Sequence, residues 1–117
     1  GWDTKYGGIF YFLDRSGRSP TQLEWNMKLW WPHNEALIAF LMAFRATGEA
    51  RYLARFQQMH DYAFAKFPDP RHGEWYGYLD RHGEVTHRFK GSPYKGCFHL
   101  PRALYLALEE MDKLDVP

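Results

Sequence analysis

The sequence predicts an all-α protein, built from helix pairs with short β-hairpins in the long loops, that forms part of an α/α toroid. Helical stretches show apolar patterns of 3.6-residue period, and hairpin-like segments precede the first and the third of them. Two of these segments are similar, residues 7–17 (GGIFYFLDRSG) and 74–83 (EWYGYLDRHG), which indicates an internal repeat of about 65 residues. Repeated helix pairs bury their faces by stacking on neighbours, and two units leave open edges. The chain is therefore expected to supply less than half of a closed ring.

The first hairpin is expected within residues 1–24. Residues 9–13 are rich in strand formers, and residues 14–17 have the composition of a turn. Pro20 places the return segment at an edge or at a strand start. Residues 73–90 repeat the same arrangement, with a run of aromatic residues, a turn and a return segment.

Three helices are expected, over residues 32–47, 49–67 and 99–114. The first and the third are apolar around most of their circumference, which is typical of inner, buried helices. The second carries one apolar stripe and is expected to be a half-exposed outer helix. Gly48 and Pro68 mark the ends of the first two helices.

Composition excludes several classes of function. The net charge is +1, with 15 basic and 14 acidic residues well mixed, which argues against nucleic-acid binding and electrostatic membrane binding. The single cysteine, Cys97, excludes an internal disulfide framework and fits a reducing, cytoplasmic compartment. No apolar run reaches membrane-spanning length, and no signal peptide is evident. The chain starts without methionine, so we expect it to be a fragment of a longer protein.

Two helix starts combine a histidine with a proline. Residues 29–35 (LWWPHNE) and 95–102 (KGCFHLPR) each place the pair at the head of an apolar helix. Proline suits the first helical turn, and the positive end of the helix dipole suits polar substrates. The repeated placement favours a shared pocket into which His33 and His99 both point, where a histidine suits proton transfer near pH 7. The alternative is that both are structural histidines at helix boundaries.

The neighbours of these histidines are further candidates. Glu35 is a candidate active-site carboxylate, or a first-turn residue that interacts with the helix dipole. The aromatic content of 19% indicates a stacking surface, for which the candidates are Trp30 and Trp31, with Tyr94 as a weaker one; core packing is the alternative. Two cationic residues could bind ligand oxygens or form surface salt bridges, Lys95 and Arg102. Cys97 lacks the signature of a catalytic thiol, although His99 lies close to it, and no Walker loop, dinucleotide fingerprint or zinc spacing is present.

Three motifs resemble the N-acylglucosamine 2-epimerase (renin-binding protein) family. They are residues 20–25 (PTQLEW), residues 27–33 (MKLWWPH) followed by Glu35, and residues 95–99 (KGCFH) followed by Pro101 and Arg102. The resemblance covers essentially the whole chain. It implies that residues 1–117 are the C-terminal portion of a single (α/α)6-barrel domain. The acylglucosamine branch fits better than the cellobiose branch, which usually carries tryptophan at the position of Tyr94.

The resemblance implies interconversion of N-acetyl-D-glucosamine and N-acetyl-D-mannosamine, by removal of the C2 proton of the ring-opened sugar and its return to the opposite face. His99 matches one family base, Glu35 matches an active-site carboxylate, and His33 accompanies it, while Trp30 or Trp31 would form the sugar platform. The second base is expected in a Gly-His motif before residue 1, and an active-site arginine earlier still. The isolated 117 residues are therefore expected to be inactive.

The resemblance also bears on cofactors and partners. It implies no required cofactor and no metal, with ATP as an effector, a homodimer at full length, and a renin-like protein as a further partner. Two other functions remain open from the residues. One is a non-catalytic protein-binding module with exposed aromatic residues, and the other is a glycoside hydrolase, for which Glu24, Glu35 and Glu74 are the plausible acids.

Overall fold

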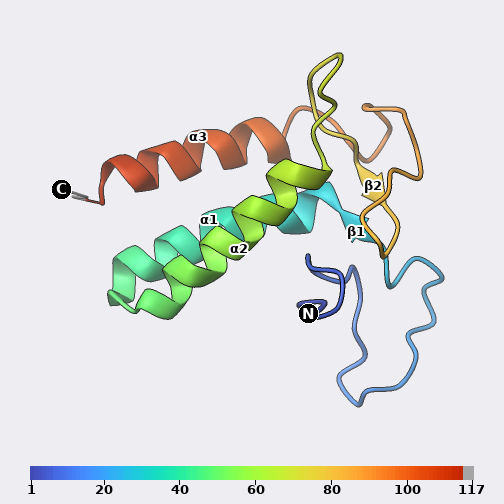
Figure 1. The fold of residues 1–117 in the computed structure, drawn as a ribbon, viewed down its shortest axis with the longest axis horizontal. Coiled ribbons are helices and arrows are strands. Elements are labelled where there is room, and N and C mark those ends of the chain that lie inside the picture. Colours follow the sequence, from blue (N-terminus) through green and yellow to red (C-terminus); the bar gives the residue numbers. More distant parts are fainter. Residues whose placement is uncertain (115–117) are drawn as a thin grey trace.

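The computed structural model describes residues 1–114, and three helices dominate it: α1 (Trp30–Thr47), α2 (Ala50–Lys66) and α3 (His99–Asp112). α1 packs against both α2 and α3. α1 and α3 run in the same direction and α2 runs opposite to them, so that the irregular segments gather at the end where α1 and α3 begin (Figure 1). The mostly helical fold is confirmed, and it places both predicted histidine-bearing helix starts at one end of the molecule.

The ends of α1 and α3 follow the predicted signals, with small shifts. α1 begins at Trp30, two residues before the predicted start, so that Pro32 is its third residue. Pro101 is likewise the third residue of α3. A proline in the first turn removes an N–H that would have no intrahelical partner. At the other end of α1, Gly48 adopts φ 68°, and its N–H donates to the Phe44 carbonyl.

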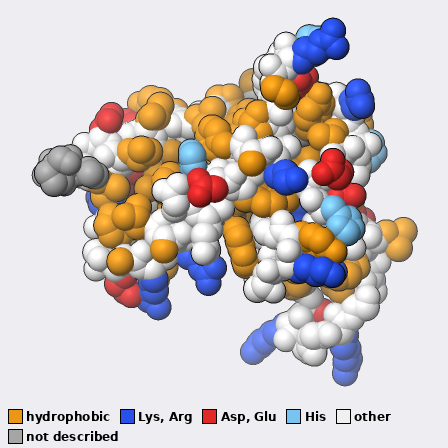
Figure 2. Space-filling model, viewed as in Figure 1, with side chains coloured by type: hydrophobic (Ala, Val, Ile, Leu, Met, Phe, Trp, Pro, Cys, Tyr) orange, Lys and Arg blue, Asp and Glu red, His pale blue; other side chains and the backbone are white. Residues whose placement is uncertain are grey.

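The hydrophobic core lies between α1, α2 and the irregular segments at the end of the molecule where α1 and α3 begin. Met59, Ala63 and Phe67 from the α2 side are fully buried against α1, as the predicted stripe requires. Apolar side chains also remain exposed over the helical part of the face in Figure 2, and α3 contributes Leu108 and Met111 to the exposed set. Within residues 1–114, no helix has both the length and the apolar character that crossing a bilayer requires.

The predicted hairpins are largely replaced by a pairing between the repeats. β1 (Lys28–Leu29) pairs antiparallel with β2 (Tyr78–Leu79), with Leu29 opposite Tyr78. The expected strand over residues 9–13 is reduced to an isolated bridge between Trp2 and Ile9. The hairpin of residues 73–90 keeps a single bridge between Leu79 and Val85. Leu79 is fully buried between two partners, since it lies opposite Lys28 of β1 on one side and Val85 on the other.

The internal repeat is visible in backbone geometry, with a spacing of 66 residues. The Asp3 carboxylate accepts from the backbone N–H of residues 5 and 6, and the Asp69 carboxylate accepts from those of residues 71 and 72. Asp14 and Asp80 make a second matching pair of turns, in which each carboxylate accepts backbone N–H groups two and four residues ahead. The repeat therefore extends from sequence to hydrogen bonding.

Candidate active site

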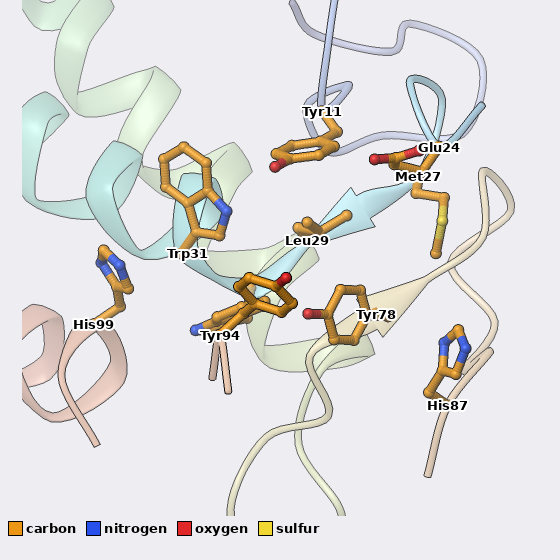
Figure 3. Close-up of a pocket in the computed structure, with 10 residues that line it drawn as sticks. Tyr11, Glu24, Met27, Leu29, Trp31, Tyr78, His87, Tyr94 and His99 are labelled. Carbon is orange, nitrogen blue, oxygen red and sulfur yellow. The ribbon is translucent and has the colours of Figure 1, made fainter. Parts of the chain in front are cut away.

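A cavity of about 660 Å³ opens where α1 and α3 begin. Aromatic side chains make most of its wall, with Trp30 and Trp31 from α1 and Tyr11, Tyr78 and Tyr94 from the loops and β2. Figure 3 shows Trp31 and His99 on one side of the cavity and Met27 and His87 on the other. A wall of aromatic rings with few polar groups is the usual surface on which the apolar face of a sugar stacks.

The two tryptophans of α1 divide between core and cavity. Trp30 is buried in the core as well as lining the cavity, and its indole Nε1 has no hydrogen-bond partner among the described residues. Trp31 is half-buried, and its ring lies 5.8 Å from that of His99. Tyr94, which also lines the cavity, is 83% exposed. The candidate platform residues therefore all reach the cavity, with Trp31 adjacent to the candidate base.

His99 lines the cavity and is hydrogen-bonded to the carboxylate of Glu35. His99 is the first residue of α3, and its Nδ1 lies 2.9 Å from Glu35 Oε1 on α1. A carboxylate only accepts hydrogen bonds, so Nδ1 carries the proton in this pair. Nε2 is then the nitrogen that can take or release a second proton, which is the arrangement that a general base requires.

Arg102 keeps Glu35 ionised. Its Nη1 donates to both carboxylate oxygens of Glu35, each at 2.7 Å, from one turn along α3. Partial burial by itself would raise the pKa of Glu35, but the hydrogen bonds from His99 and Arg102, with their charges, outweigh it and lower that pKa. Arg102 was a candidate for direct binding of ligand oxygens, but its guanidinium binds the carboxylate and is absent from the cavity wall of residues 1–114.

His33 does not open into the cavity, so the prediction of two histidines in one pocket is wrong for this residue. Its ring is fully buried and packs against the rings of Tyr62 and Phe67. Nδ1 donates to the Leu29 carbonyl at 2.6 Å, and Nε2 accepts from the N–H of Ile9 at 3.1 Å. Burial lowers the pKa of His33 to about 4, which leaves the ring neutral. With both nitrogens bound to backbone, His33 fixes the start of α1 to the N-terminal loop.

Lys95 is also placed differently from the prediction. Its side chain is 2% exposed, and its ammonium group donates to both carboxylate oxygens of Glu74 and to the Lys90 carbonyl. It lines a second, smaller cavity of about 320 Å³ beside the start of α3. Cys97 is exposed beside the same small cavity, outside the aromatic one. Neither side chain is in the aromatic cavity of the described residues.

Sequence reasoning missed a buried ion cluster under β1. Asp3 Oδ2 accepts from Lys28 Nζ and from Arg81 Nε, each at 3.0 Å, although Asp3 and Lys28 are almost fully buried. Burial would raise the pKa of Asp3, but these two cations and a backbone hydrogen bond hold it well below its usual range. The cluster fixes the strand that leads into Trp30. The signal available in the sequence was a lysine inside an otherwise apolar segment.

The cavity wall also includes residues that were not predicted to bind the sugar. Tyr11, Met27, Tyr78 and His87 were not among the candidates, and Glu24 had been considered only as an acid of a hydrolase. Their positions depend on the pairing of β1 with β2, which joins segments about 50 residues apart. The surplus of aromatic residues in the predicted hairpins was the one signal that could have identified the tyrosines.

Comparison with known proteins places this geometry in a family. The family model described as N-acylglucosamine 2-epimerase (GlcNAc 2-epimerase) matches residues 1–101. The chain is 54% identical to the N-acylglucosamine 2-epimerase of Bos taurus and 53% identical to that of Homo sapiens, in each case over 114 residues. Each alignment covers 97% of this chain and 27% of the relative, so the chain spans about a quarter of the length of these curated relatives.

Solved structures agree on the fold. A D-mannose isomerase superposes with a TM-score of 0.81 and 26% identity, over 92% of this chain and 27% of that one. The cellobiose 2-epimerase of Spirochaeta thermophila DSM 6192 gives a TM-score of 0.69 at 26% identity, over 74% of this chain and 22% of that one. The three helices are thus arranged as in part of an (α/α)6 barrel. With the family model matching most of its length, the chain belongs to the N-acylglucosamine 2-epimerase family.

Proposed function

We propose that this chain carries one acid–base residue and part of the sugar platform of an epimerase that interconverts N-acetyl-D-glucosamine and N-acetyl-D-mannosamine. The observation that carries the proposal is the position of His99, which lines the aromatic cavity while its Nδ1 is bound to a carboxylate held ionised by Arg102. The names of the mammalian relatives support the choice of substrate.

The proposed chemistry is proton transfer at C2 of the ring-opened sugar. The C1 aldehyde acidifies the neighbouring C2–H bond, because the electron pair of that bond can move toward the carbonyl oxygen as an enolate. Nε2 of His99 takes the proton, and the resulting imidazolium is stabilised by the Glu35 carboxylate on Nδ1. When the electron pair returns to C2, a proton added to the opposite face gives the other epimer. In the reverse direction, the same nitrogen donates the proton.

Two faces of C2 require two proton-transfer groups, and this chain supplies His99 for one of them. His33 is an unsuitable partner because its nitrogens are bound to backbone groups and its ring is fully buried. We propose, as the family resemblance implies, that the second base lies outside residues 1–117 and that these residues alone are inactive. Epimerisation of N-acetylmannosamine by a verified pure 117-residue chain would contradict this part of the proposal.

The positions of the acidic residues argue against the glycoside hydrolase alternative. Of its three candidate acids, Glu35 is paired with Arg102 and Glu74 with Lys95. A general acid in a hydrolase needs a raised pKa, whereas Arg102 and His99 lower that of Glu35. Glu24 is then left as one carboxylate on the cavity wall, where the two-carboxylate mechanism needs a pair.

The proposed function is tested by incubating the complete protein in which this sequence occurs with N-acetylmannosamine in D2O. Proton NMR should show N-acetylglucosamine forming with deuterium at C2, because the abstracted proton exchanges with solvent. Mannose and cellobiose, the sugars in the names of the structural neighbours, serve as competing substrates. Turnover of either of them at a higher kcat/KM than the acetamido sugar would overturn the proposed substrate, and absence of C2 exchange with every sugar would overturn the reaction.

A further inference from the structure

The internal repeat places a glutamate where its counterpart is a glycine. In the first repeat, the Asp3 N–H donates to the Gly8 carbonyl at 2.8 Å, and in the second the Asp69 N–H donates to the Glu74 carbonyl at 2.8 Å. Gly8 adopts φ 70° and Glu74 adopts φ 62°, so both lie in the left-handed region. Among the described residues, Glu74 is the one residue other than glycine with positive φ. A side chain in this conformation is strained, and such strain is typical of positions where the side chain has a function.

The carboxylate of Glu74 anchors the loop that precedes α3. Both of its oxygens accept from Lys95 Nζ, at 2.8 and 2.7 Å, and the same ammonium group donates to the Lys90 carbonyl at 3.0 Å. The aliphatic part of Lys95 crosses Gly77 so closely that an added Cβ there would lie 2.8 Å from Lys95 Cδ. Its ammonium lies 6.0 Å from the ring of Trp30. These contacts therefore fix the Lys95 side chain beside Trp30, outside the aromatic cavity.

The residue before this lysine is on the cavity surface. Tyr94 lines the cavity but is 83% exposed, so few contacts of its own hold its ring in place. Its backbone is held by the loop, in which Ser92 Oγ accepts from the N–H groups of Tyr94 and Lys95 at 3.1 and 3.0 Å. The position of the tyrosine ring thus depends on where Lys95 is anchored, and hence on Glu74.

We propose that Glu74 and Lys95 are a positioning pair that holds Tyr94 on the wall of the sugar-binding cavity and so sets the affinity for the sugar without taking part in proton transfer. The inference rests on the proposed function, because it assigns Tyr94 to sugar binding. It also gives a reason for the strained glutamate, since a glycine at position 74 would relieve the backbone but could not bind Lys95.

The test replaces Glu74 in the complete protein with glycine, which accepts the positive φ, and with glutamine, which keeps one acceptor for Lys95. We expect Glu74→Gly to raise KM about tenfold with kcat changed less than about twofold, and Glu74→Gln to have a smaller effect in the same direction. Glu84→Gln is the matched control, because Glu84 makes a looser ion pair with Lys66, at 3.9 Å and largely exposed. Glu84→Gln should leave both constants unchanged.

A double-mutant cycle with Tyr94→Ala separates positioning from general damage. If Glu74 acts through Tyr94, then Glu74→Gly should have little effect on KM once the tyrosine ring is gone. Additive effects of Glu74→Gly and Tyr94→Ala on KM would overturn the proposal, as would an unchanged KM in Glu74→Gly or a loss confined to kcat.

Hydrogen exchange gives a readout that does not depend on turnover. The amide N–H groups of Tyr94 and Lys95 should exchange faster in Glu74→Gly than in the parent, while the amides of α2 remain unchanged. Unchanged exchange at these two amides would overturn the positioning role. If the parent protein turns over no sugar but its Glu74→Gly variant shows the faster exchange, the proposed function fails while the structural link from Glu74 to Tyr94 stands.

Discussion

Replacing Glu35 with glutamine removes the charge beside His99 while keeping the shape of the side chain. Glu35 Oε1 accepts from His99 Nδ1 at 2.9 Å, and Arg102 binds both oxygens of the same carboxylate. When His99 takes the C2 proton, its hydrogen bond to Glu35 becomes one between opposite charges and strengthens. Glutamine cannot provide this stabilisation, so Glu35→Gln is expected to slow proton transfer more than it weakens sugar binding.

The expected fall in kcat depends on how far the His99–Glu35 hydrogen bond is exposed to solvent. Hydrogen bonds to charged groups contribute about 1.5–3 kcal/mol, which corresponds to roughly a 10- to 150-fold change in rate. The side chains of His99 and Glu35 are 30% and 35% exposed, so solvent screens part of the interaction. The lower part of the range applies, and we expect kcat of the complete protein to fall about 10- to 40-fold in Glu35→Gln, with KM changed less than about threefold.

The assay is the rate of C2 deuterium incorporation from D2O into N-acetylmannosamine, measured by proton NMR at saturating sugar. Glu49→Gln is the matched control, because Glu49 makes a 2.7 Å ion pair with Arg51 on the exposed start of α2. That variant should exchange at the parental rate. An unchanged kcat in Glu35→Gln, or a change confined to KM, would refute the reasoning that the carboxylate assists proton transfer.

Three further predictions concern stability of the complete protein, measured by urea unfolding. The pKa of His33 is lowered by burial to about 4, below the ordinary value of 6.5, so the unfolded chain binds more protons between these values. The free energy of unfolding should therefore fall by up to about 3 kcal/mol from pH 6.5 to 4. If a His33→Gln variant lost as much stability over this pH range as the parent, protonation of His33 would not be the cause. Asp3→Asn should lower the free energy of unfolding by about 3–5 kcal/mol, because Lys28 stays buried without its partner. The double variant Asp3→Asn, Lys28→Met should lose less stability than the two single variants together. Additive losses would contradict a coupled buried pair. Gly17→Ala should cost about 1–2 kcal/mol for its positive φ alone. Gly8→Ala should destabilise the protein more, because a Cβ at Gly8 would lie 2.6 Å from a tyrosine ring and 2.8 Å from His33 Nε2. Equal losses in the two variants would contradict the expected steric clash at Gly8.

The helices could be predicted because their signals are local. The apolar pattern of α1, the glycine at its end and the first-turn Pro32 are all readable within about 20 residues of sequence. The 66-residue repeat was also readable, since Asp14 and Asp80 lie in nearly identical turns. The pairing of β1 with β2 could not be predicted from the sequence, because each strand has a segment nearer in the chain that resembles a hairpin partner.

The two histidines show where local sequence stops being informative. His33 and His99 are 66 positions apart and both occupy helix starts, yet His33 is buried by the ring of Tyr62 from α2 and that of Phe67, the residue that follows α2. His99 instead faces the cavity, with its Nδ1 on Glu35. The difference arises from which segment packs over each helix start, and that depends on contacts between distant parts of the chain. The pairing of Arg102 with Glu35 across α1 and α3 was hidden for the same reason.

The role of His99 rests most directly on the fate of the C2 proton. In the complete protein, His99→Ala should abolish conversion of N-acetylmannosamine into C2-deuterated N-acetylglucosamine in D2O, while His72→Ala, at an exposed histidine away from the cavity, should convert it at the parental rate. Conversion at the parental rate in folded His99→Ala would mean that the imidazole lining the aromatic cavity is not the group that moves the proton.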